Sequence, residues 1–554
     1  MPMQKGSLVI IICLVGLSLS GQIMNTKSID SLFNNWDNSH APGCALGIVK
    51  DGQLIYSNGY GMANMEYSIP NTDSTVFRIG STSKQFTAAC IIRLVEQGRL
   101  TLDETLQEIF PDFPDYARKI TINHLLNHTS GIRDYLQLSF LKGLGDDDFY
   151  TDDDVMAWLV NQSDLNFEPG AEFLYSNSGY WLLGQIVLEV AGMNLAEFAA
   201  RELFQPLGME HTHFHNDHNR IVKYRASRYV PDPRDGYKIS MTTLDMIGDG
   251  GIFTTIKDLK KWDDAYYQSS VLSHSFWEMM TQQGILNNGE QIDYASGLFI
   301  ADYKGLKTIR HGGAFVGFRA EMLRFPEQHV TIAILANRGD ARPSSLANQV
   351  ADIILKDVFP AQEKIKKDDG AVPARQPEKL NLKQLAGNYE LQAGMVLNVT
   401  LENDTLVVEQ SWDKVVYQIV RTDGNTFVIP HNDGILFTFS KVEDGFSQQL
   451  EVLQSGNKMH LYRKPTMDPS QVNLADYAGD YYSQELDVTY HFRLEDDILV
   501  VQIDKKATAV CSISGPDAIS MYLGLARFRR GEGKITGFEL DSGRVKNLKF
   551  VRTD

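Results

Sequence analysis

The C-terminal third of the chain contains the same sequence pattern twice. LAGNY at residues 385–389 returns as YAGDY at 477–481, and LENDTLVV at 401–408 returns as LEDDILVV at 494–501. A period of about 90 residues is too long for a solenoid, and each copy alternates short apolar runs with turn residues. The sequence therefore predicts two small antiparallel units of one design, either barrels or sandwiches.

The first two thirds mix predicted strands and helices. Residues 44–56 are typical of a β-hairpin that turns at Asp51-Gly52, and a helix is predicted from Ser81 to Gln97, followed by Gly98. Further helices are expected at residues 124–127 and 178–190, and a buried strand at 330–336. Because strands stand at both ends with helices between them, we expect one α/β unit over residues 25–360 whose terminal strands pair in one sheet.

Two further segments lie outside these units. The charged, proline-containing stretch at residues 364–377 is typical of a linker. Lys5 precedes an apolar run at residues 8–19, which fits a secretory signal better than a membrane span of roughly 20 residues. We therefore expect a signal peptide (1–21), an α/β domain (22–363), a linker (364–378) and two repeats (379–465 and 466–554). Such a protein would be secreted or periplasmic, without stable membrane insertion after signal cleavage; an N-terminal anchor is the alternative.

Charge and cysteine content exclude several classes of ligand. The 70 acidic and 52 basic residues give a formal net charge of −18, so we expect no nucleic-acid partner. After signal removal Cys44, Cys90 and Cys511 remain, an odd and widely spaced set that predicts neither a disulfide framework nor a zinc site. We expect no cofactor, and the sequence favours no particular oligomeric state.

The pattern S-x-x-K also occurs twice, and its context separates the copies. Ser81 and Lys84 open the apolar helix predicted at residues 81–97, one turn apart on one face. A lysine buried there must be paired or functional, and the serine needs a neighbour that accepts its proton. A simple helix cap with a solvent-directed lysine is the alternative. Ser455 and Lys458 flank a Gly-Asn turn between predicted strands, so we expect no nucleophile there.

The tripeptide YSN is duplicated as well. Tyr56 falls within the hairpin predicted at residues 44–56, where an aromatic side chain is ordinary filler. Tyr175 follows a turn and precedes a helix, a position from which a side chain can reach a substrate. A third element, His311-Gly312-Gly313-Ala314, carries consecutive glycines that let a ligand approach the backbone.

STSK (81–84), YSN (175–177) and HGG (311–313), in this order, resemble the three motifs of penicillin-recognising serine hydrolases. The class C β-lactamase-related branch, with D-aminopeptidases, DD-peptidases and esterases, is the most similar; FRIGSTSKQF, HLLNHTSGIRDY and FEPGAEFLYSNSGY support this over residues 35–360. The resemblance implies an α/β (α+β) β-lactamase/transpeptidase-like domain, with an antiparallel sheet flanked by helices. It also implies two small all-β, lipocalin-like barrels after this domain.

The resemblance further implies a role for each matched side chain. Ser81 would attack the substrate carbonyl and form an acyl-enzyme. Lys84 would hold Ser81 and Tyr175 in one proton network, and Tyr175 would pass the proton to the leaving group. Asn177 would bind the substrate amide or Lys84.

The third motif would supply the oxyanion hole and one wall. The backbone N–H groups of Ser81 and Ala314 would bind the developing oxyanion, and Gly312 and Gly313 would contact the substrate. His311 stands where β-lactamases usually carry lysine. A neutral imidazole has no fixed positive charge, which disfavours an anionic β-lactam as the natural ligand.

We therefore expect an exported, cofactor-independent serine hydrolase that acts on amides in small molecules or peptides. The alternatives are a carboxylesterase, a β-lactamase and a catalytically silent peptide- or glycan-binding protein. Two histidine groups, His124 with His128 and the set His211, His213, His215 and His218, are interpreted as packing rather than metal sites. The aspartates at 146–148 and 152–154 lack the EF-hand spacing, and Thr151 is expected to cap a helix.

Overall fold

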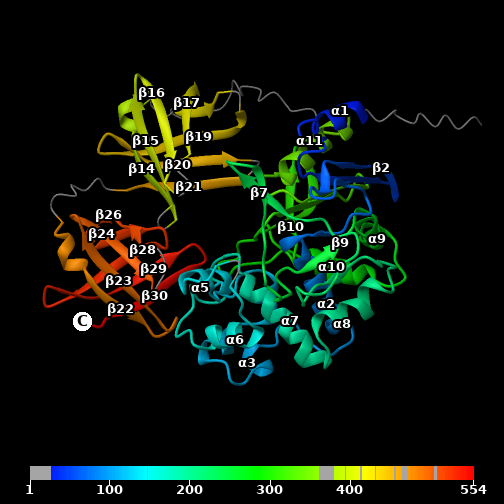
Figure 1. Cartoon of the computed structure of the whole chain (residues 1–554), viewed down its shortest axis with the longest axis horizontal. Helices are drawn as coiled ribbons and strands as arrows, with labels where there is room; N and C mark the ends of the chain where they lie inside the picture. Colours follow the sequence, from blue (N-terminus) through cyan, green and yellow to red (C-terminus); the bar gives the residue numbers. More distant parts are fainter. Residues whose placement is uncertain are drawn as a thin grey trace, which may run out of the picture.

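The computed structural model describes residues 26–145, 148–360, 380–392, 395–411, 415–430, 432–454, 457–464, 472–503 and 508–554. The expected signal peptide and linker, and Ser455 of the second S-x-x-K, lie outside these residues. An α/β domain occupies one side of the molecule and two barrel-shaped sheets the other (Figure 1).

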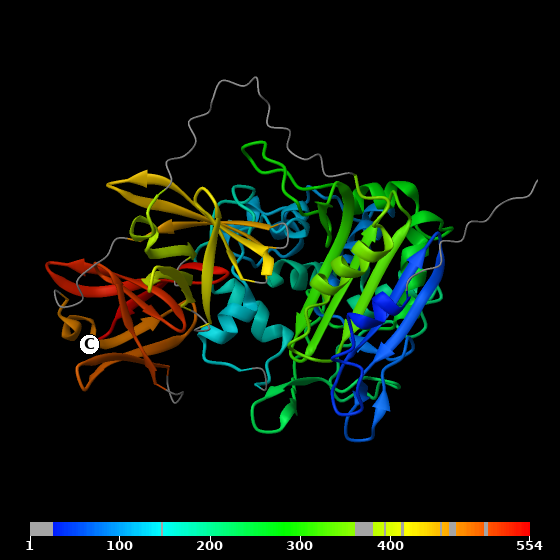
Figure 2. The ribbon, with the colours of Figure 1, turned by 90° about the horizontal axis from the view of Figure 1, so that it is seen from above.

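The α/β domain is built on a six-stranded antiparallel sheet in the order β10-β11-β12-β13-β1-β2. Its strands are β1 (Cys44–Lys50), β2 (Gln53–Tyr60), β10 (Phe299–Tyr303), β11 (Leu306–Phe315), β12 (Phe318–Phe325) and β13 (Val330–Ala336). The expected pairing of the terminal strands is confirmed, because β1 pairs with β13 along its whole length. Figure 2 shows these strands side by side, away from the C-terminal end.

Both faces of this sheet are buried. Leu46 and Ile332 pack with Val350 of α11 (Pro343–Ile354), while the alternate residues Ala45 and Leu335 belong to the core on the opposite face. There α9 (Ile256–Tyr267) packs against β1 and β13. Double burial explains why VTIAILA reads as one continuous apolar run.

Helix α1 (Thr26–Ser31) packs beside α11 on the first face. The remaining helices surround the core on the α9 face. They are α2 (Lys84–Glu96), α3 (Leu106–Ile109), α4 (Ile122–Leu126), α5 (Tyr135–Leu141), α6 (Asp152–Val160), α7 (Asn177–Ala191), α8 (Leu195–Ala199) and α10 (His274–Thr281), with the short turns η1 (Gly80–Ser83), η2 (Asp115–Lys119) and η3 (Ala200–Phe204). Small sheets are formed by β3 (Met62–Asn64), β4 (Ile69–Pro70), β5 (Phe77–Arg78), β6 (His213–Phe214), β7 (Tyr229–Asp232), β8 (Gly236–Ile239) and β9 (Ile252–Thr254). In the described part of the chain, no single helix is long and apolar enough to cross a membrane. The helices at residues 177–191 and 195–204 meet both criteria only when they are taken together, and they are bent relative to each other by 78°.

The helix that follows Ser81 begins later in the chain than predicted. Ser81 lies in the 3-10 turn η1, and the α-helix α2 begins at Lys84. Ser81 is therefore not a helix cap. Its hydroxyl instead lies 3.3 Å from Lys84 Nζ.

The first repeat forms a closed eight-stranded barrel. After α12 (Leu382–Leu385) its strands are β14 (Gly387–Gln392), β15 (Met395–Glu402), β16 (Thr405–Gln410), β17 (Val416–Asp423), β18 (Thr426–Ile429), β19 (Asn432–Glu443), β20 (Phe446–Gln454) and β21 (Asn457–Arg463). Each strand pairs with the next in the chain, and β14 closes on β21.

The second repeat forms a nine-stranded, nearly closed sheet in the order β25-β24-β23-β22-β30-β29-β28-β27-β26. After η5 (Leu474–Tyr477) its strands are β22 (Gly479–Ser483), β23 (Val488–Glu495), β24 (Ile498–Ile503), β25 (Ala509–Val510), β26 (Ser512–Gly515), β27 (Ala518–Met521), β28 (Gly524–Gly531), β29 (Lys534–Ser542) and β30 (Val545–Arg552). Equivalent residues of the two repeats make the same hydrogen bond. The Tyr389 hydroxyl donates to Leu385 O, and the Tyr481 hydroxyl donates to Tyr477 O.

The two barrels relate differently to the α/β domain. The interior of the first barrel is an apolar cluster of its own, whereas that of the second is continuous with the core of the α/β domain. At this junction Arg133 forms a buried ion pair with Glu485, and the Tyr490 hydroxyl donates to Leu141 O over 2.8 Å. The second barrel is thus packed onto the domain that carries the three motifs.

Candidate active site

The turn that carries Ser81 is pressed against strand β11. Gly80 has φ +51°, and a Cβ at that position would lie 2.8 Å from Ala314 N. A Cβ at Gly313 would lie only 1.9 Å from Ile79 O. These glycines let the backbones of η1 and β11 touch, which places the Ser81 and Ala314 backbones on the two sides of one narrow site.

Lys84 is fully buried and connects three elements through its ammonium nitrogen. Lys84 Nζ lies 3.3 Å from Ser81 Oγ, 2.9 Å from Asn177 Oδ1 and 2.5 Å from Asp249 O. It is not the solvent-directed lysine of the alternative interpretation. The first S-x-x-K therefore brings an amine to its serine, as the nucleophile hypothesis requires.

Burial changes the protonation of this group. Loss of hydration lowers the pKa of Lys84 to about 7; the Asp249 carboxylate acts in the opposite direction, and the Arg544 charge lowers the pKa further. Burial likewise raises the pKa of Asp249 to about 6. Near neutral pH a substantial share of Lys84 is therefore an uncharged amine that can accept a proton.

Tyr175 lies in the loop before α7, with its ring close to two basic side chains. Lys84 Nζ is 4.8 Å and the Arg544 guanidinium carbon 4.7 Å from the ring centroid. Its buried hydroxyl has no fixed hydrogen-bond partner among the described residues. Burial raises the pKa of Tyr175, and the neighbouring Ser81 side chain lowers it. The second motif thus presents a protonated, uncommitted hydroxyl beside the serine.

Asn177 begins α7 and is held by a residue that sequence reasoning missed. Its backbone N–H donates to Asp134 Oδ2 over 2.7 Å, while its side-chain oxygen accepts from Lys84. Asp134 also caps α5 by accepting from the N–H groups of Leu136 and Gln137. The Asp134 carboxylate therefore fixes where Asn177, and through it Lys84, can lie.

His311 is buried in β11 with both ring nitrogens engaged. Nδ1 lies 2.6 Å from Gly312 O, to which it can only donate, so Nε2 accepts from the Tyr294 hydroxyl at 3.0 Å. Burial is the main cause that lowers the pKa of His311, to about 3, and the Lys84 charge adds to it. The expected neutral imidazole is what the geometry gives, with a fixed orientation.

A cavity of 680 Å³ opens over these groups. Its walls include Ser81, Tyr175, Asn177, His311 and Ala314, together with Gly312 and Gly313. The structure thus brings the candidate residues of the three motifs to one cavity, except Lys84, which is buried behind the lining and contacts Ser81 and Asn177. Arg544, which comes from the second barrel, lines the same cavity.

The other YSN copy, at residues 56–58, does not line this cavity. Tyr56 is in β2, and its hydroxyl donates to the Asp30 carboxylate and contacts the Tyr60 hydroxyl at 2.7 Å. This copy is a structural part of the hairpin, as interpreted from the sequence.

The histidine groups are dispersed. His128 lies beyond the end of α4, at φ +58°, so His124 and His128 do not share a helix. His124 Nδ1 accepts from Thr121 N and His128 Nδ1 from Ser176 N. His213 and His215 contact each other, with 3.3 Å between Nε2 and Nδ1.

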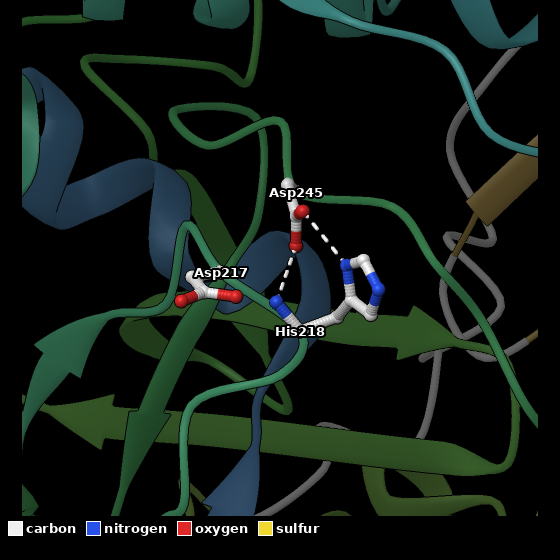
Figure 3. A group of neighbouring side chains, drawn as sticks. All are labelled: Asp217, His218 and Asp245. Atoms are coloured by element: carbon white, nitrogen blue, oxygen red, sulfur yellow. Dashed lines mark hydrogen bonds and ion pairs between the residues drawn. The ribbon is translucent and has the colours of Figure 1, made fainter.

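His218 is part of a loop cluster with Asp217 and Asp245 (Figure 3). Its ring Nδ1 lies 2.8 Å from Asp245 Oδ2, and its backbone N–H donates to Asp245 Oδ1 over 2.6 Å. One oxygen or nitrogen atom from each of the three side chains lies within 4.8 Å of the others. Thr151 caps α6 as predicted, with Asp154 completing a capping box.

For three residues, Asp134, Asp249 and Arg544, the sequence carried no signal of a place in the site. Asp249 sits in the glycine-rich segment GDGG, which marks a close backbone approach but does not say to what. Asp134 precedes an apolar run and is readable as a helix cap. Arg544 lies in a turn of the second repeat, and no local pattern relates it to residues more than 360 positions away.

Comparison with known proteins relates this chain to one family. The Beta-lactamase family model matches residues 30–355. Penicillin-binding protein 4* of Bacillus subtilis (strain 168) is 30% identical over 405 residues, which are 69% of this chain and 87% of that protein. D-aminopeptidase of Gluconobacter oxydans (strain 621H) is 26% identical over 318 residues, 56% of this chain and only 58% of that protein.

Among solved structures, the octameric penicillin-binding protein homologue from Pyrococcus abyssi matches with a TM-score of 0.55 at 22% identity, over 88% of this chain and 100% of that chain. This likeness confirms the fold. Together with a family model that spans more than half of the sequence, it leads to one conclusion: the chain belongs to the Beta-lactamase family and is a serine hydrolase of that family.

Proposed function

We propose that the protein is an exported hydrolase that cleaves amide bonds in peptides, including peptides with D-residues, through an acyl-enzyme on Ser81. One observation carries this proposal: a buried amine, Lys84, lies 3.3 Å from the Ser81 hydroxyl and has a pKa near 7. Such an amine can take the serine proton at neutral pH.

The remaining groups fit the steps that follow. Ser81 Oγ would bond to the carbonyl carbon while its proton passes to Lys84, and the backbone N–H groups of Ser81 and Ala314 would bind the oxyanion. The proton would then reach the leaving nitrogen through the Tyr175 hydroxyl, and the C–N bond would break. Water would hydrolyse the resulting ester by the reverse proton route. His311, with both nitrogens occupied, would shape the wall without exchanging protons.

The substrate class draws support from the relatives' names, a penicillin-binding protein and a D-aminopeptidase. Export draws support from the apolar run at residues 8–19. A carboxylesterase would use the same groups, so the test must compare scissile bonds directly.

The decisive experiment pairs labelling with turnover. A fluorophosphonate probe should label the wild-type protein and fail on Ser81→Ala, whereas Ser344→Ala should still be labelled. Ser344 lines the same cavity, but its hydroxyl donates to Glu321. Labelling of Ser81→Ala would refute the assignment. The purified protein is then given D- and L-aminoacyl anilides, short acyl esters and a chromogenic cephalosporin. Ester hydrolysis without anilide hydrolysis above the Ser81→Ala background would favour the esterase.

A further inference from the structure

The loop that carries Tyr175 runs alongside residues 128–131, the segment HTSG. Three backbone carbonyls of this segment accept N–H groups of the loop: Gly131 O from Asn166 N at 2.8 Å, Thr129 O from Gly170 N at 2.8 Å and His128 O from Leu174 N at 3.0 Å. The two backbones touch, because a Cβ at Gly131 would lie 2.2 Å from Phe167 O. The course of the loop is therefore set by this segment.

His128 makes the hydrogen bonds closest to Tyr175. Its backbone oxygen accepts from Leu174 N, and its ring Nδ1 accepts from Ser176 N at 3.1 Å. Leu174 and Ser176 are the residues that precede and follow Tyr175. One residue thus fixes the backbone on both sides of the tyrosine.

The imidazole of His128 also supports the Tyr175 ring. The two ring centroids are 4.1 Å apart, and His128 is only 1% exposed. The imidazole lies 4.5 Å from the ring of Tyr294 as well, whose hydroxyl donates to His311. His128 therefore links the tyrosine of the second motif to the histidine of the third.

Two properties of His128 indicate more than space filling. Burial is the main cause that holds the pKa of His128 well below its usual range, and the Lys84 charge acts in the same direction, so the imidazole is neutral and Nδ1 can accept a hydrogen bond. Its backbone φ is +58°, in the left-handed region that most residues with a Cβ avoid. Such a conformation persists only where the surrounding contacts determine it, and here they are the contacts to the Tyr175 loop.

His128 is not among the described residues that line the cavity, so it does not touch the substrate. An effect on catalysis must pass through Tyr175, the residue proposed to protonate the leaving group. Proton transfer depends on where that hydroxyl lies, since a misplacement of about 1 Å can cost about 10²-fold in rate.

We propose that His128 is a positioning residue, which holds the Tyr175 hydroxyl within reach of the leaving group by accepting the Ser176 N–H and by supporting the Tyr175 ring. This inference rests on the proposed function and adds the residue that places its proton donor. It requires that the loss of His128 slows only those reactions of Ser81 in which the leaving group needs a proton.

The test compares two phosphonate probes on the full-length protein. With both probes, Ser81 Oγ bonds to phosphorus and the serine proton passes to Lys84. A fluorophosphonate releases fluoride, a weak base that leaves without a proton. An O-phenyl phosphonate with the same alkyl chain releases phenoxide, a strong base that takes a proton from Tyr175, and Tyr175 regains one from Lys84. Intact-protein mass spectrometry gives the second-order labelling rate constants.

His128→Phe keeps a ring but loses the acceptor for Ser176 N. It should lower the rate with the phenyl probe on the order of 10- to 100-fold and leave the fluorophosphonate rate within a few-fold. His128→Asn keeps an acceptor and tolerates the left-handed backbone, so it should recover most of the phenyl-probe rate. An equal loss with the two probes would mean that His128 only stabilises the site, and would overturn the proposal.

The combination with Tyr175→Phe separates positioning from structural damage. Because His128 acts through the Tyr175 hydroxyl, the double variant with His128→Phe should react with the phenyl probe as fast as Tyr175→Phe alone. Additive losses would overturn the proposal. His124→Phe is the matched control: His124 Nδ1 likewise accepts a backbone N–H, from Thr121 at 3.2 Å, and its loss should leave both rates unchanged.

Folding and the proposed function are checked separately. Circular dichroism establishes that each variant folds; should His128→Phe fail, His128→Ala removes the acceptor without adding volume and carries the same expectation. A wild-type protein that neither probe labels would refute the proposed function. A labelled wild type whose two rates are unchanged by the loss of His128 would refute this inference alone.

Discussion

Arg133 of the α/β domain and Glu485 of the second barrel form an ion pair from which water is almost wholly excluded, with side-chain exposures of 0% and 6%. Arg133 also donates to Lys546 O and Asn547 O, and Glu485 accepts from Ser163 Oγ. This network holds the barrel, and therefore the turn that carries Arg544, against the catalytic domain.

Glu485→Gln should loosen this junction strongly. It leaves the Arg133 charge buried without a counter-ion, and breaking one partner of a buried pair costs on the order of 3 kcal/mol. In chemical denaturation, the first unfolding transition should occur at a lower denaturant concentration than in the wild type. Glu168→Gln is the control, because its pair with Lys119 is 67% and 72% exposed and is worth about 1 kcal/mol at most. Equal effects of both substitutions would mean that the buried pair does not hold the barrel.

The pH dependence of acylation should follow Lys84. Only the neutral amine accepts the Ser81 proton, so the labelling rate should rise as the pH increases through about 7 and fall about tenfold per unit below it. The second-order rate constant for a neutral fluorophosphonate between pH 5 and 9 measures this directly. A rate that does not change over this range would exclude Lys84 as the base.

Two substitutions should shift the pH dependence of the labelling rate in opposite directions. The Asp249 carboxylate raises the pKa of Lys84 and the Arg544 guanidinium lowers it. Asp249→Asn should therefore shift the half-maximal rate to lower pH, and Arg544→Gln should shift it to higher pH. Shifts of the same sign would show that the substitutions act by disturbing structure rather than through charge.

The sequence predicted the fold wherever the signal was local. The hairpin formed by β1 and β2, the apolar strand β13 and the two repeats are visible in short-range patterns, and all are present. The start of α2 was misplaced by three residues, because S-T-S can form either a helix end or a 3-10 turn and only the contact with β11 decides.

The site residues also fall into two groups: those that local motifs indicate and those that only the fold brings together. Ser81, Lys84 and Tyr175 belong to motifs that a reader can find in the printed sequence. Asp134 and Arg544 do not, because their roles arise from contacts between segments more than 40 and 360 residues apart. The turn chemistry of Ser542-Gly543 indicates a hairpin, but what the hairpin touches is decided by how the second barrel docks.

Tyr175→Phe and Tyr56→Phe should separate chemistry from stability. Loss of the uncommitted Tyr175 hydroxyl should lower turnover about 10²- to 10⁴-fold, the usual contribution of a positioned proton donor. Loss of the Tyr56 hydroxyl should leave turnover within a few-fold and cost about 1 kcal/mol of stability, through its bonds to Asp30 and Tyr60. The measurements are steady-state kinetics and thermal unfolding on both variants. Equal loss of turnover would remove the distinction between the two YSN copies.

The adjacent glycines of the third motif should differ when each is changed to alanine. A Cβ at Gly313 would lie 1.9 Å from Ile79 O, so η1 and β11 must separate and the N–H groups of Ser81 and Ala314 must move apart. Losing one oxyanion donor typically costs about 10²- to 10³-fold in rate, so Gly313→Ala should lower the labelling rate by at least that much. A Cβ at Gly312 would lie 3.0 Å from Glu321 Oε2, the end of a side chain that can shift slightly, so Gly312→Ala should have a much smaller effect. Circular dichroism establishes that both variants fold. If the folded Gly313→Ala protein were labelled as fast as Gly312→Ala, the contact between η1 and β11 would not be what forms the oxyanion hole.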